Sequence, residues 1–438
     1  MIRIMKFSEL TPEEVFARTE PTMDVSDIVT GIIDEVKAEG DAAIIRYAAK
    51  FDGIDSENFT LEVSDEEKAL AIQSLNETDP GFMDILRKAA ANIVKFHSKQ
   101  VRTSFIINDT DGVIMGQKVV PLERAGIYVP GGTAAYPSTV LMDSIPALIA
   151  GCSEIIMTTP SDPDGTVNPA IIGAAIAAEE TAGCEGKIRI FKTGGAQAIA
   201  ALAYGTESIP QVDKIVGPGN AFVAEAKRQV FGRVAIDMIA GPSEILAVSD
   251  GKSDPAVVAA DMLSQAEHDK NASAVLVTDS EELAYAVQQE IEEQLSRLER
   301  EAIARPSIEN NGKIIVADDI MQAIEISNTI APEHLELCVD NPFDLLDKIK
   351  HAGSIFMGRN CPEALGDYFA GPNHTLPTSG TARFSSPLSV DDFVKKMQYT
   401  YYTADALGEV AEDIAAFARK EGLTGHARSV LIRGERSK

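Results

Sequence analysis

The sequence predicts an α/β protein with two incomplete Rossmann-like, doubly wound parallel-sheet domains and small helical N- and C-terminal extensions. From position 125 onward, short apolar segments of strand length alternate with helical segments. This alternation is typical of crossover connections between parallel strands. Glycine turns follow several of the apolar segments, and each alternating block is too short for a complete six-stranded dinucleotide fold.

The 438 residues are sufficient for more than one domain. We expect an N-terminal extension over residues 1–20 and a helical tail domain over residues 389–438. A first α/β domain is predicted to be discontinuous, with a helical N-terminal part over residues 21–124 and the remainder over residues 245–388. Residues 125–244 are expected to form the second α/β domain.

The elements before position 125 are predominantly helical. Apolar residues at helical spacing, separated by glycine or proline, predict helices over 25–37, 41–51, 65–75 and 82–99. Two apolar stretches, 105–108 and 113–120, flank Asp111 and Gly112. Because this dipeptide suits a tight turn, the sequence predicts a β-hairpin here.

The first alternating block has expected strands over 125–129, 154–159, 187–192 and 214–216, and helices over 138–150, 169–181, 196–204 and 220–231. The second block opens with a strand over 244–249 and a helix in which the capping residue Asp254 precedes Pro255. Its further strands are expected over 274–277, 313–316, 335–339 and 354–357, and its helices over 281–302, 320–328 and 342–351. The tail is predicted to be all helix, over 390–397 with Ser389 as the cap, 406–421 and 424–431.

The chain is strongly acidic, with 67 acidic and 39 basic residues and a formal net charge of -28. This charge repels phosphate backbones and anionic lipids, so we expect neither nucleic-acid nor membrane partners. No apolar run is long enough to span a bilayer, and the N-terminal residues lack the apolar core of a signal peptide. We therefore expect a cytoplasmic location.

The four cysteines, Cys152, Cys184, Cys338 and Cys361, are widely spaced and form no C-x-x-C pair. This spacing excludes the common zinc-knuckle and redox motifs and is typical of reduced thiols. Each cysteine lies beside apolar or turn residues, so packing in the interior is favoured over a nucleophilic role.

Three glycine turns follow predicted strands and lead into helices, at 130–132, 194–197 and 217–220. Each can direct backbone N–H groups and the positive end of a helix at an anion, at the carboxyl edge of a parallel sheet. A single turn of this kind often reflects steric need alone. Three in one sheet give a nucleotide site the same weight as steric need.

Ligand-type side chains are found in the second block and the tail. Gln265 and His268 are three residues apart near a helix end, so they can face one ion, although His268 can instead serve only as a cap. Glu333 and His334 are adjacent before a predicted strand, at its exposed entry, which suits two separate proton-transfer tasks. Asp367 and His374 lie in a glycine-rich loop, and His426 follows the last long helix.

Several long motifs together resemble the histidinol dehydrogenase family. They are GPGNAFVAEAKRQVFGRVAIDMIAGPSEILAV, SQAEHD, NTIAPEHLEL and ALGDYFAGPNHTLPTSGTARFSSPLSVDDFVKK. The similarity runs in order from AGIYVPGG to GLTGHARS. It implies a zinc-dependent, NAD-linked oxidation of L-histidinol to L-histidine through bound L-histidinal, the last two steps of histidine biosynthesis.

The resemblance also implies roles for individual residues. It implies one Zn2+ per subunit, on Gln265, His268, Asp367 and His426, a ligand set typical of a catalytic zinc. It implies His334 as general base, Glu333 as the group that activates water, and NAD+ contacts from Tyr128, Gln197 and Asn220. The implied substrate contacts are Ser243, Gln265, His268, His334, Asp367, Glu421 and His426, with His374 nearby. It further implies a homodimer in which Glu421 and His426 of the tail complete the partner's site in trans; folding of the tail onto its own chain is the alternative.

Two other classes of protein fit parts of this pattern. A zinc hydrolase would also use histidines, an aspartate and a glutamate-activated water, but it would not reduce NAD+. A metabolite-binding protein without catalysis would keep the glycine turns and tolerate the loss of Glu333 and His334. Reduction of NAD+ in the presence of histidinol separates all three.

Overall fold

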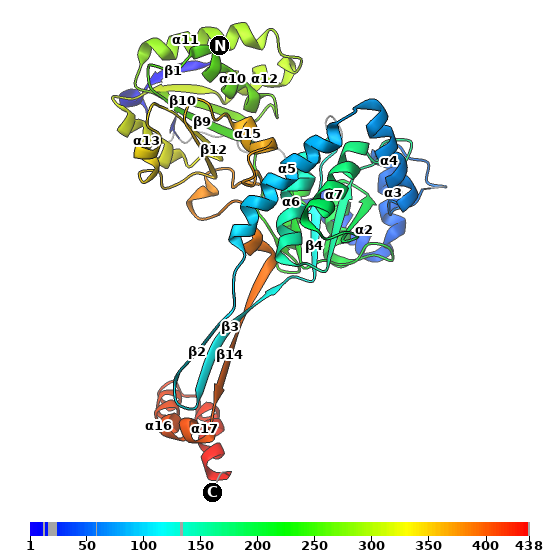
Figure 1. Cartoon of the computed structure of the whole chain (residues 1–438), viewed down its shortest axis with the longest axis vertical. Coiled ribbons are helices and arrows are strands. Elements are labelled where there is room, and N and C mark those ends of the chain that lie inside the picture. The colour runs from blue at the N-terminus through cyan, green and yellow to red at the C-terminus, as the bar shows by residue number, and fades with distance from the viewer. Residues whose placement is uncertain (12–13, 16–23, 58, 132–134, 437–438) are drawn as a thin grey trace. The chain divides into compact units, whose positions relative to one another are not determined.

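The computed structural model describes residues 1–11, 14–15, 24–57, 59–131 and 135–436 (Figure 1). The chain forms two compact units. The sheet unit contains Met1–Gln100 and Leu122–Phe393, and the tail unit contains Val101–Pro121 and Val394–Lys438. The predicted extension over 1–20 lies partly outside the described residues.

The first sheet of the sheet unit is parallel throughout, with strand order β6-β5-β4-β7-β8 among the described residues. Its strands are β4 (Arg124–Tyr128), β5 (Glu154–Thr159), β6 (Ile188–Lys192), β7 (Lys214–Val216) and β8 (Ala235–Ile236). The helices between them are α6 (Pro137–Ala150), α7 (Pro169–Ala182), α8 (Gly195–Tyr204) and α9 (Ala221–Val230). The α6–α7 pair and the α8–α9 pair belong to separate apolar clusters, so the predicted doubly wound arrangement is confirmed.

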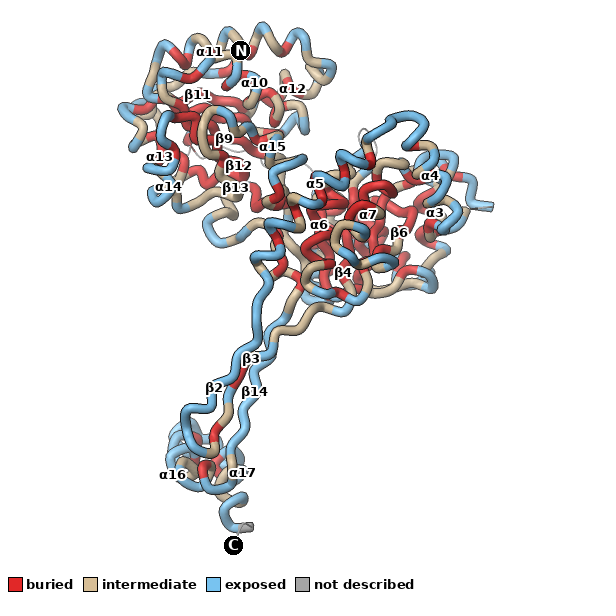
Figure 2. Tube along the Cα trace, viewed as in Figure 1, coloured by how far each residue is buried: buried red, intermediate tan, exposed pale blue. Residues whose placement is uncertain are grey.

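The N-terminal helices extend both apolar layers of this first sheet (Figure 2). They are α2 (Ser26–Glu39), α3 (Asp41–Phe51), α4 (Asp65–Thr78) and α5 (Phe82–His97). Leu86 and Ile93 of α5 pack with α6 and α7, whereas Val29 of α2 and Ile44 of α3 pack with α8 and α9. The prediction that residues 21–124 join residues 245–388 is therefore wrong, because their apolar faces are covered by the 125–244 sheet.

The second sheet is also parallel, with order β1-β11-β10-β9-β12-β13 among the described residues. Its strands are β1 (Arg3–Lys6), β9 (Glu244–Ser249), β10 (Ser273–Thr278), β11 (Lys313–Val316), β12 (His334–Cys338) and β13 (Ser354–Met357). The N-terminal residues are thus more than an extension, since β1 forms the edge strand beside β11. With β1 included, this sheet has six strands rather than the smaller number expected from residues 245–388.

Helices cover both faces of the second sheet. They are α10 (Pro255–Ala266), α11 (Glu281–Leu295), α12 (Glu301–Asn310), α13 (Ile320–Ile330), α14 (Phe343–Leu346) and α15 (Glu363–Tyr368). The single helix expected over 281–302 is wrong, because a turn after Leu295 lets Ala304 and Ile308 of α12 enter the same core as α11. The helix expected over 342–351 is shorter, since Asn328 Oδ1 accepts hydrogen bonds from the Lys350 and His351 amides and holds the chain in a turn.

The tail unit combines an antiparallel sheet with two helices. Its elements are β2 (Phe105–Thr110), β3 (Val113–Pro121), β14 (Val394–Tyr402), α16 (Ala404–Lys420) and α17 (Thr424–Arg436). The predicted hairpin is confirmed as β2 and β3, with Gly112 at a positive φ of 69° in the turn. Of the helix expected over 390–397, only Val390–Phe393 is helical, as a short 3-10 helix, because β14 pairs with β3 from Val394 to Tyr402. The apolar spacing of 390, 393, 394 and 397 suits a helix, but the Tyr-Thr-Tyr-Tyr run that follows favours a strand.

Candidate functional site

The first sheet reverses its strand order between β4 and β7, and ligands of doubly wound sheets bind at the carboxyl ends of such strands. Tyr128 is the last residue of β4, and the Gly217 turn follows β7 directly. The Tyr128 hydroxyl accepts a hydrogen bond of 3.1 Å from the Gly195 amide at the start of α8. Two of the three predicted glycine turns therefore meet near Tyr128; Gly132 of the third lies outside the described residues.

The other two residues expected to contact NAD+ lie at helix N-termini beside this edge. Asn220 caps α9, because its Oδ1 accepts hydrogen bonds from the Phe222 and Val223 amides at 3.0 and 3.2 Å. Its Nδ2 group is then the part that can donate to a ligand. Gln197 is in the first turn of α8 and is buried.

Glu333 and His334 are held by the main chain of the neighbouring strand β9. The Glu333 Oε2 atom accepts a hydrogen bond of 2.8 Å from the Glu244 amide. His334 Nδ1 lies 2.9 Å from the Glu244 carbonyl oxygen. Because a carbonyl can only accept, Nδ1 carries the proton and donates, which leaves a lone pair on Nε2. One residue of β9 thus orients both side chains.

Both side chains are buried, which corrects the expectation of an exposed strand entry. The reason is the sheet register: β12 pairs with β9 on one side and β13 on the other, so its first residue is already interior. Burial lowers the pKa of His334 and raises the pKa of Glu333. Burial thus favours the neutral imidazole, in which Nε2 can accept a proton.

The free Nε2 of His334 faces two carboxylates on α15. Its distances to Glu363 Oε1 and to Asp367 Oδ1 are both 3.9 Å. The loop prediction for Asp367 is wrong, since it lies on α15 one turn after Glu363. Burial, followed by the charge of Asp367, raises the pKa of Glu363. Sequence reasoning missed Glu363; the proline before it was a signal for a helix start.

His374 approaches the same aspartate, with Nδ1 at 3.6 Å from Asp367 Oδ1. Its segment is fixed on both sides of the imidazole. Asn373 Nδ2 donates to the Met142 carbonyl oxygen at 2.6 Å, and Thr375 Oγ1 donates to the Asp143 carboxylate at 2.6 Å. Helix α6 of the first sheet therefore anchors a segment that belongs to the second, and burial of Asp143 raises its pKa to about 7.

The arrangement fits a metal ion bound through nitrogen and oxygen. Within the described part of the chain, three buried groups near α15 lack hydrogen-bond partners for polar atoms: both amide atoms of Gln265, Nε2 of His334 and Oε1 of Glu363. Buried polar atoms of this kind normally have partners. His268, just beyond α10, is exposed and interacts electrostatically with Asp367 and His374. A cation would satisfy these atoms, and imidazole, amide and carboxylate donors without thiolate suit a catalytic zinc.

The remaining predicted residues fall in two places. Ser243 directly precedes β9 and Glu244, so it is next in sequence to the residue that orients Glu333 and His334. Glu421 ends α16, and His426 lies in the first turn of α17; both are exposed on the tail unit. Their approach to the sheet unit remains a prediction.

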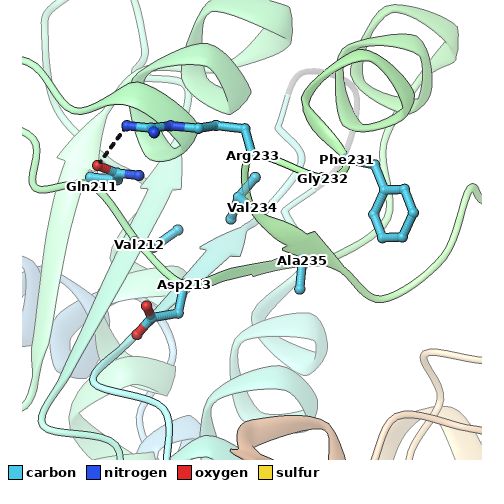
Figure 3. Close-up of a pocket in the computed structure, with 8 residues that line it drawn as sticks. All are labelled: Gln211, Val212, Asp213, Phe231, Gly232, Arg233, Val234 and Ala235. Atoms are coloured by element: carbon cyan, nitrogen blue, oxygen red, sulfur yellow. Dashed lines mark hydrogen bonds between the residues drawn. The ribbon is translucent and has the colours of Figure 1, made fainter. Parts of the chain in front are cut away.

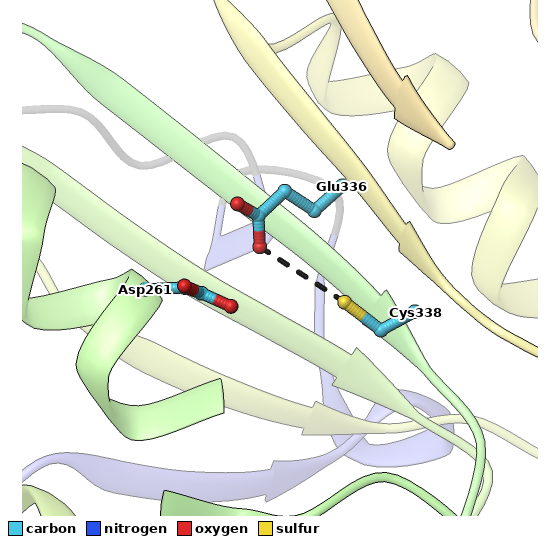
Figure 4. A group of neighbouring side chains, drawn as sticks. All are labelled: Asp261, Glu336 and Cys338. Carbon is cyan, nitrogen blue, oxygen red and sulfur yellow. Dashed lines mark hydrogen bonds between the residues drawn. The ribbon is translucent and has the colours of Figure 1, made fainter. Parts of the chain in front are cut away.

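A second acidic cluster contacts the start of α15, and its side chains are drawn in Figure 4. It contains Asp261 of α10 with Glu336 and Cys338 of β12. Glu336 Oε1 accepts a hydrogen bond of 2.8 Å from the Glu363 amide, and Cys338 Sγ lies 4.0 Å from Glu336 Oε2. Burial raises the pKa of Cys338 above the range of a reactive thiol, which supports the packing role expected for this cysteine. The cluster positions the helix that carries Glu363 and Asp367.

A surface cavity lies at the β8 edge of the first sheet (Figure 3). In the described part of the chain, its lining comes from residues 211–213 and 231–235, which include none of the predicted site residues. Arg233 and Gln211 hydrogen bond to each other at 3.2 Å across it. The cavity therefore adds nothing to the chemistry of the site.

Comparison with known proteins gives concordant results. The family model for histidinol dehydrogenase matches residues 17–434. The histidinol dehydrogenases of Syntrophotalea carbinolica and Clostridium acetobutylicum are 51% and 52% identical over 438 residues, each covering 99% of both chains. The crystal structure of histidinol dehydrogenase from Elizabethkingia anophelis matches with a TM-score of 0.90 and 39% identity, over 99% of this chain and 98% of that one. No helix among the described residues has the length and apolar character needed to cross a membrane.

Proposed function

Because the chain belongs to the histidinol dehydrogenase family, we propose that it oxidises L-histidinol to L-histidine through bound L-histidinal, with transfer of two hydrides to two NAD+. The observation that carries this proposal is the pairing of Glu333 and His334 on the main chain of Glu244. An imidazole and a carboxyl group held in one buried site support two successive oxidations, which need a base at each step and a group that activates water.

His334 serves as the general base in this proposal. Its Nε2 lone pair removes the alcohol proton while a hydride leaves the substrate carbon, which yields the aldehyde. The Glu333 carboxylate then removes a proton from water as the water adds to the aldehyde carbon, and the protonated His334 returns its proton to the aldehyde oxygen, which gives the neutral hydrate and frees Nε2 again. His334 takes a proton from the resulting hydrate as the second hydride leaves, and the carboxylic acid forms. A buried site retains the reactive aldehyde between these steps.

Gln265, His268, Asp367 and His426 would hold the metal ion, and the unpartnered amide of Gln265 supports this assignment. A bound Zn2+ would orient substrate nitrogen and oxygen atoms and polarise them as a Lewis acid. Burial opposes ionisation of Asp367, but the hydrogen bond and charge of His374 hold the pKa of Asp367 low. Asp367 is therefore suited to bind a cation as a carboxylate. Ser243, Glu421 and His374 are proposed to contact the substrate.

Tyr128, Gln197 and Asn220 are proposed to bind NAD+ at the reversal point of the first sheet. Their positions at the carboxyl edge of the sheet support this assignment. Tyr128 ends β4, Asn220 caps α9 after β7, and Gln197 lies in the first turn of α8. Asn220 would donate through Nδ2, because its Oδ1 already caps α9.

The test is a turnover assay with the zinc-loaded protein, L-histidinol and NAD+, followed by nicotinamide absorbance. We expect two NADH formed per histidine produced, since an alcohol is carried to an acid. One NADH per substrate with release of aldehyde would limit the proposal to the first step. No NADH would favour a hydrolase or a binding protein.

We further propose a homodimer whose tail residues Glu421 and His426 complete the partner's site in trans. Co-refolding of His334→Ala with His426→Ala subunits tests this. In a trans arrangement each mixed dimer has one intact site, so an equal mixture should recover about a quarter of wild-type activity by counting over symmetric dimers. Recovery no higher than that of the inactive parents would indicate a cis arrangement. A mixture of each mutant with itself is the matched control.

A further inference from the structure

A buried ion pair brackets the turn that follows β7. Lys227 of α9 and Asp237 after β8 form an ion pair, and each side chain is only 2% exposed. Lys227 Nζ donates a hydrogen bond of 2.9 Å to the Gly217 carbonyl oxygen. Asp237 Oδ2 accepts one of 2.8 Å from the Gly217 amide. The two charged side chains therefore hydrogen bond to both the amide and the carbonyl of a single residue, Gly217.

Gly217 is itself confined against the end of β4. Its φ is +116°, in the region that favours glycine, and a Cβ atom there would lie 2.1 Å from the Tyr128 carbonyl oxygen. The Gly217 main chain thus runs directly against Tyr128. Three residues later the chain reaches Asn220, the cap of α9. A shift at Gly217 would move the turn, and Asn220 with it, relative to Tyr128.

We propose that Lys227 and Asp237 are positioning residues for NAD+ binding. They fix the turn from Gly217 to Asn220, and this turn sets the position of the NAD+ contacts. This inference rests on the proposed function, because it takes Tyr128 and Asn220 as NAD+ contacts. Neither charged side chain reaches the surface, so the pair acts through the turn and not by contact with NAD+.

Stability alone gives a weak reason for this pair. Removing two charges from water costs about as much as their attraction returns, so apolar residues often replace buried pairs without loss of stability. The hydrogen bonds to Gly217 provide a more specific reason. They satisfy an amide and a carbonyl that the turn would otherwise leave buried between α9 and β8.

The double variant Lys227→Met, Asp237→Leu tests the proposal while leaving no buried charge unpaired. NAD+ binding is measured directly by calorimetry, without histidinol, and turnover is measured separately. We expect the dissociation constant and the KM for NAD+ to rise about tenfold, with kcat at saturating NAD+ within about twofold of wild type. The KM for histidinol and the zinc content should not change.

A matched control is available on the same strand. Lys214, at the start of β7, donates a hydrogen bond of 2.7 Å to Asp392 and forms a partly buried ion pair with it. Lys214→Met, Asp392→Leu should lower the melting temperature but leave the dissociation constant for NAD+ at the wild-type value. An equal loss of NAD+ affinity in both double variants would overturn the proposal, since the effect would then be general.

A milder substitution keeps the test decisive if the double variant does not fold. Lys227→Arg preserves the buried cation, but a planar guanidinium cannot reproduce the single Nζ donor in this space. We expect about a threefold rise in the dissociation constant for NAD+. Wild-type NAD+ affinity in a folded variant overturns the inference. If wild type binds NAD+ but does not oxidise histidinol, the proposed function fails while this inference is still tested by the binding constants.

Discussion

Removal of the metal ion is expected to abolish turnover, and added Zn2+ should restore it. The reason is the set of buried polar atoms near α15 that lack partners in the described part of the chain, Gln265 and His334 Nε2 among them. Without a cation these atoms cannot align a substrate, because nothing fixes the reacting carbon relative to the base. The measurement is activity after prolonged chelation, with zinc content determined on the same sample.

The apo protein should stay folded during this experiment. The apolar clusters on both faces of the two sheets contain none of the proposed ligands, so chelation should leave the circular dichroism spectrum unchanged. Chelator premixed with equimolar Zn2+ is the control for direct inhibition. Full activity in a sample verified as metal-free would exclude the proposed metal site.

Replacement of His334 by alanine is expected to lower kcat by about 10²–10⁴-fold in both oxidation steps, because it removes the base proposed for both hydride transfers. Glu333→Gln should act differently. The glutamine oxygen can still accept the Glu244 amide, so the geometry is preserved, but the group can no longer activate water. We therefore expect Glu333→Gln to slow formation of histidine far more than formation of the aldehyde.

The measurement separates the two half-reactions, with histidinol or histidinal as the starting substrate and single-turnover detection of NADH. His351→Ala is the matched control, since this histidine lies in a turn held by Asn328 and should leave both rates unchanged. Equal losses in both half-reactions for Glu333→Gln would contradict separate roles for the two residues.

Local patterns were sufficient for most of the fold. The strands over 154–159 and 244–249 have the predicted bounds, because each is built around a continuous run of apolar residues, as is typical of buried parallel strands. The errors have a common physical origin in long-range pairing. Nothing near Arg3 in sequence indicates that β11 is its partner strand. At Val394 the following Tyr-Thr-Tyr-Tyr run favours a strand, but the pairing with β3 determines where that strand begins.

The candidate site was predictable in its residue types but not in its environment. The spacing of Gln265 and His268 and the adjacency of Glu333 and His334 are visible in the sequence. The burial of His334 depends on the register of β12 against β9, and the role of Glu244 depends on its main chain, which no side-chain pattern reveals. Glu363 was missed for the same reason, because α15 has only six residues and no periodic pattern to detect.

The position of β1 has a consequence for synthesis on the ribosome. The partner strand of Arg3–Lys6 is Lys313–Val316, so Arg3–Lys6 must wait unpaired while the roughly three hundred residues between the two strands are translated. The first sheet meets no such delay, because its strands all lie between Arg124 and Ile236. It can therefore complete its core on the nascent chain, and the second sheet closes around the N-terminus only late in translation.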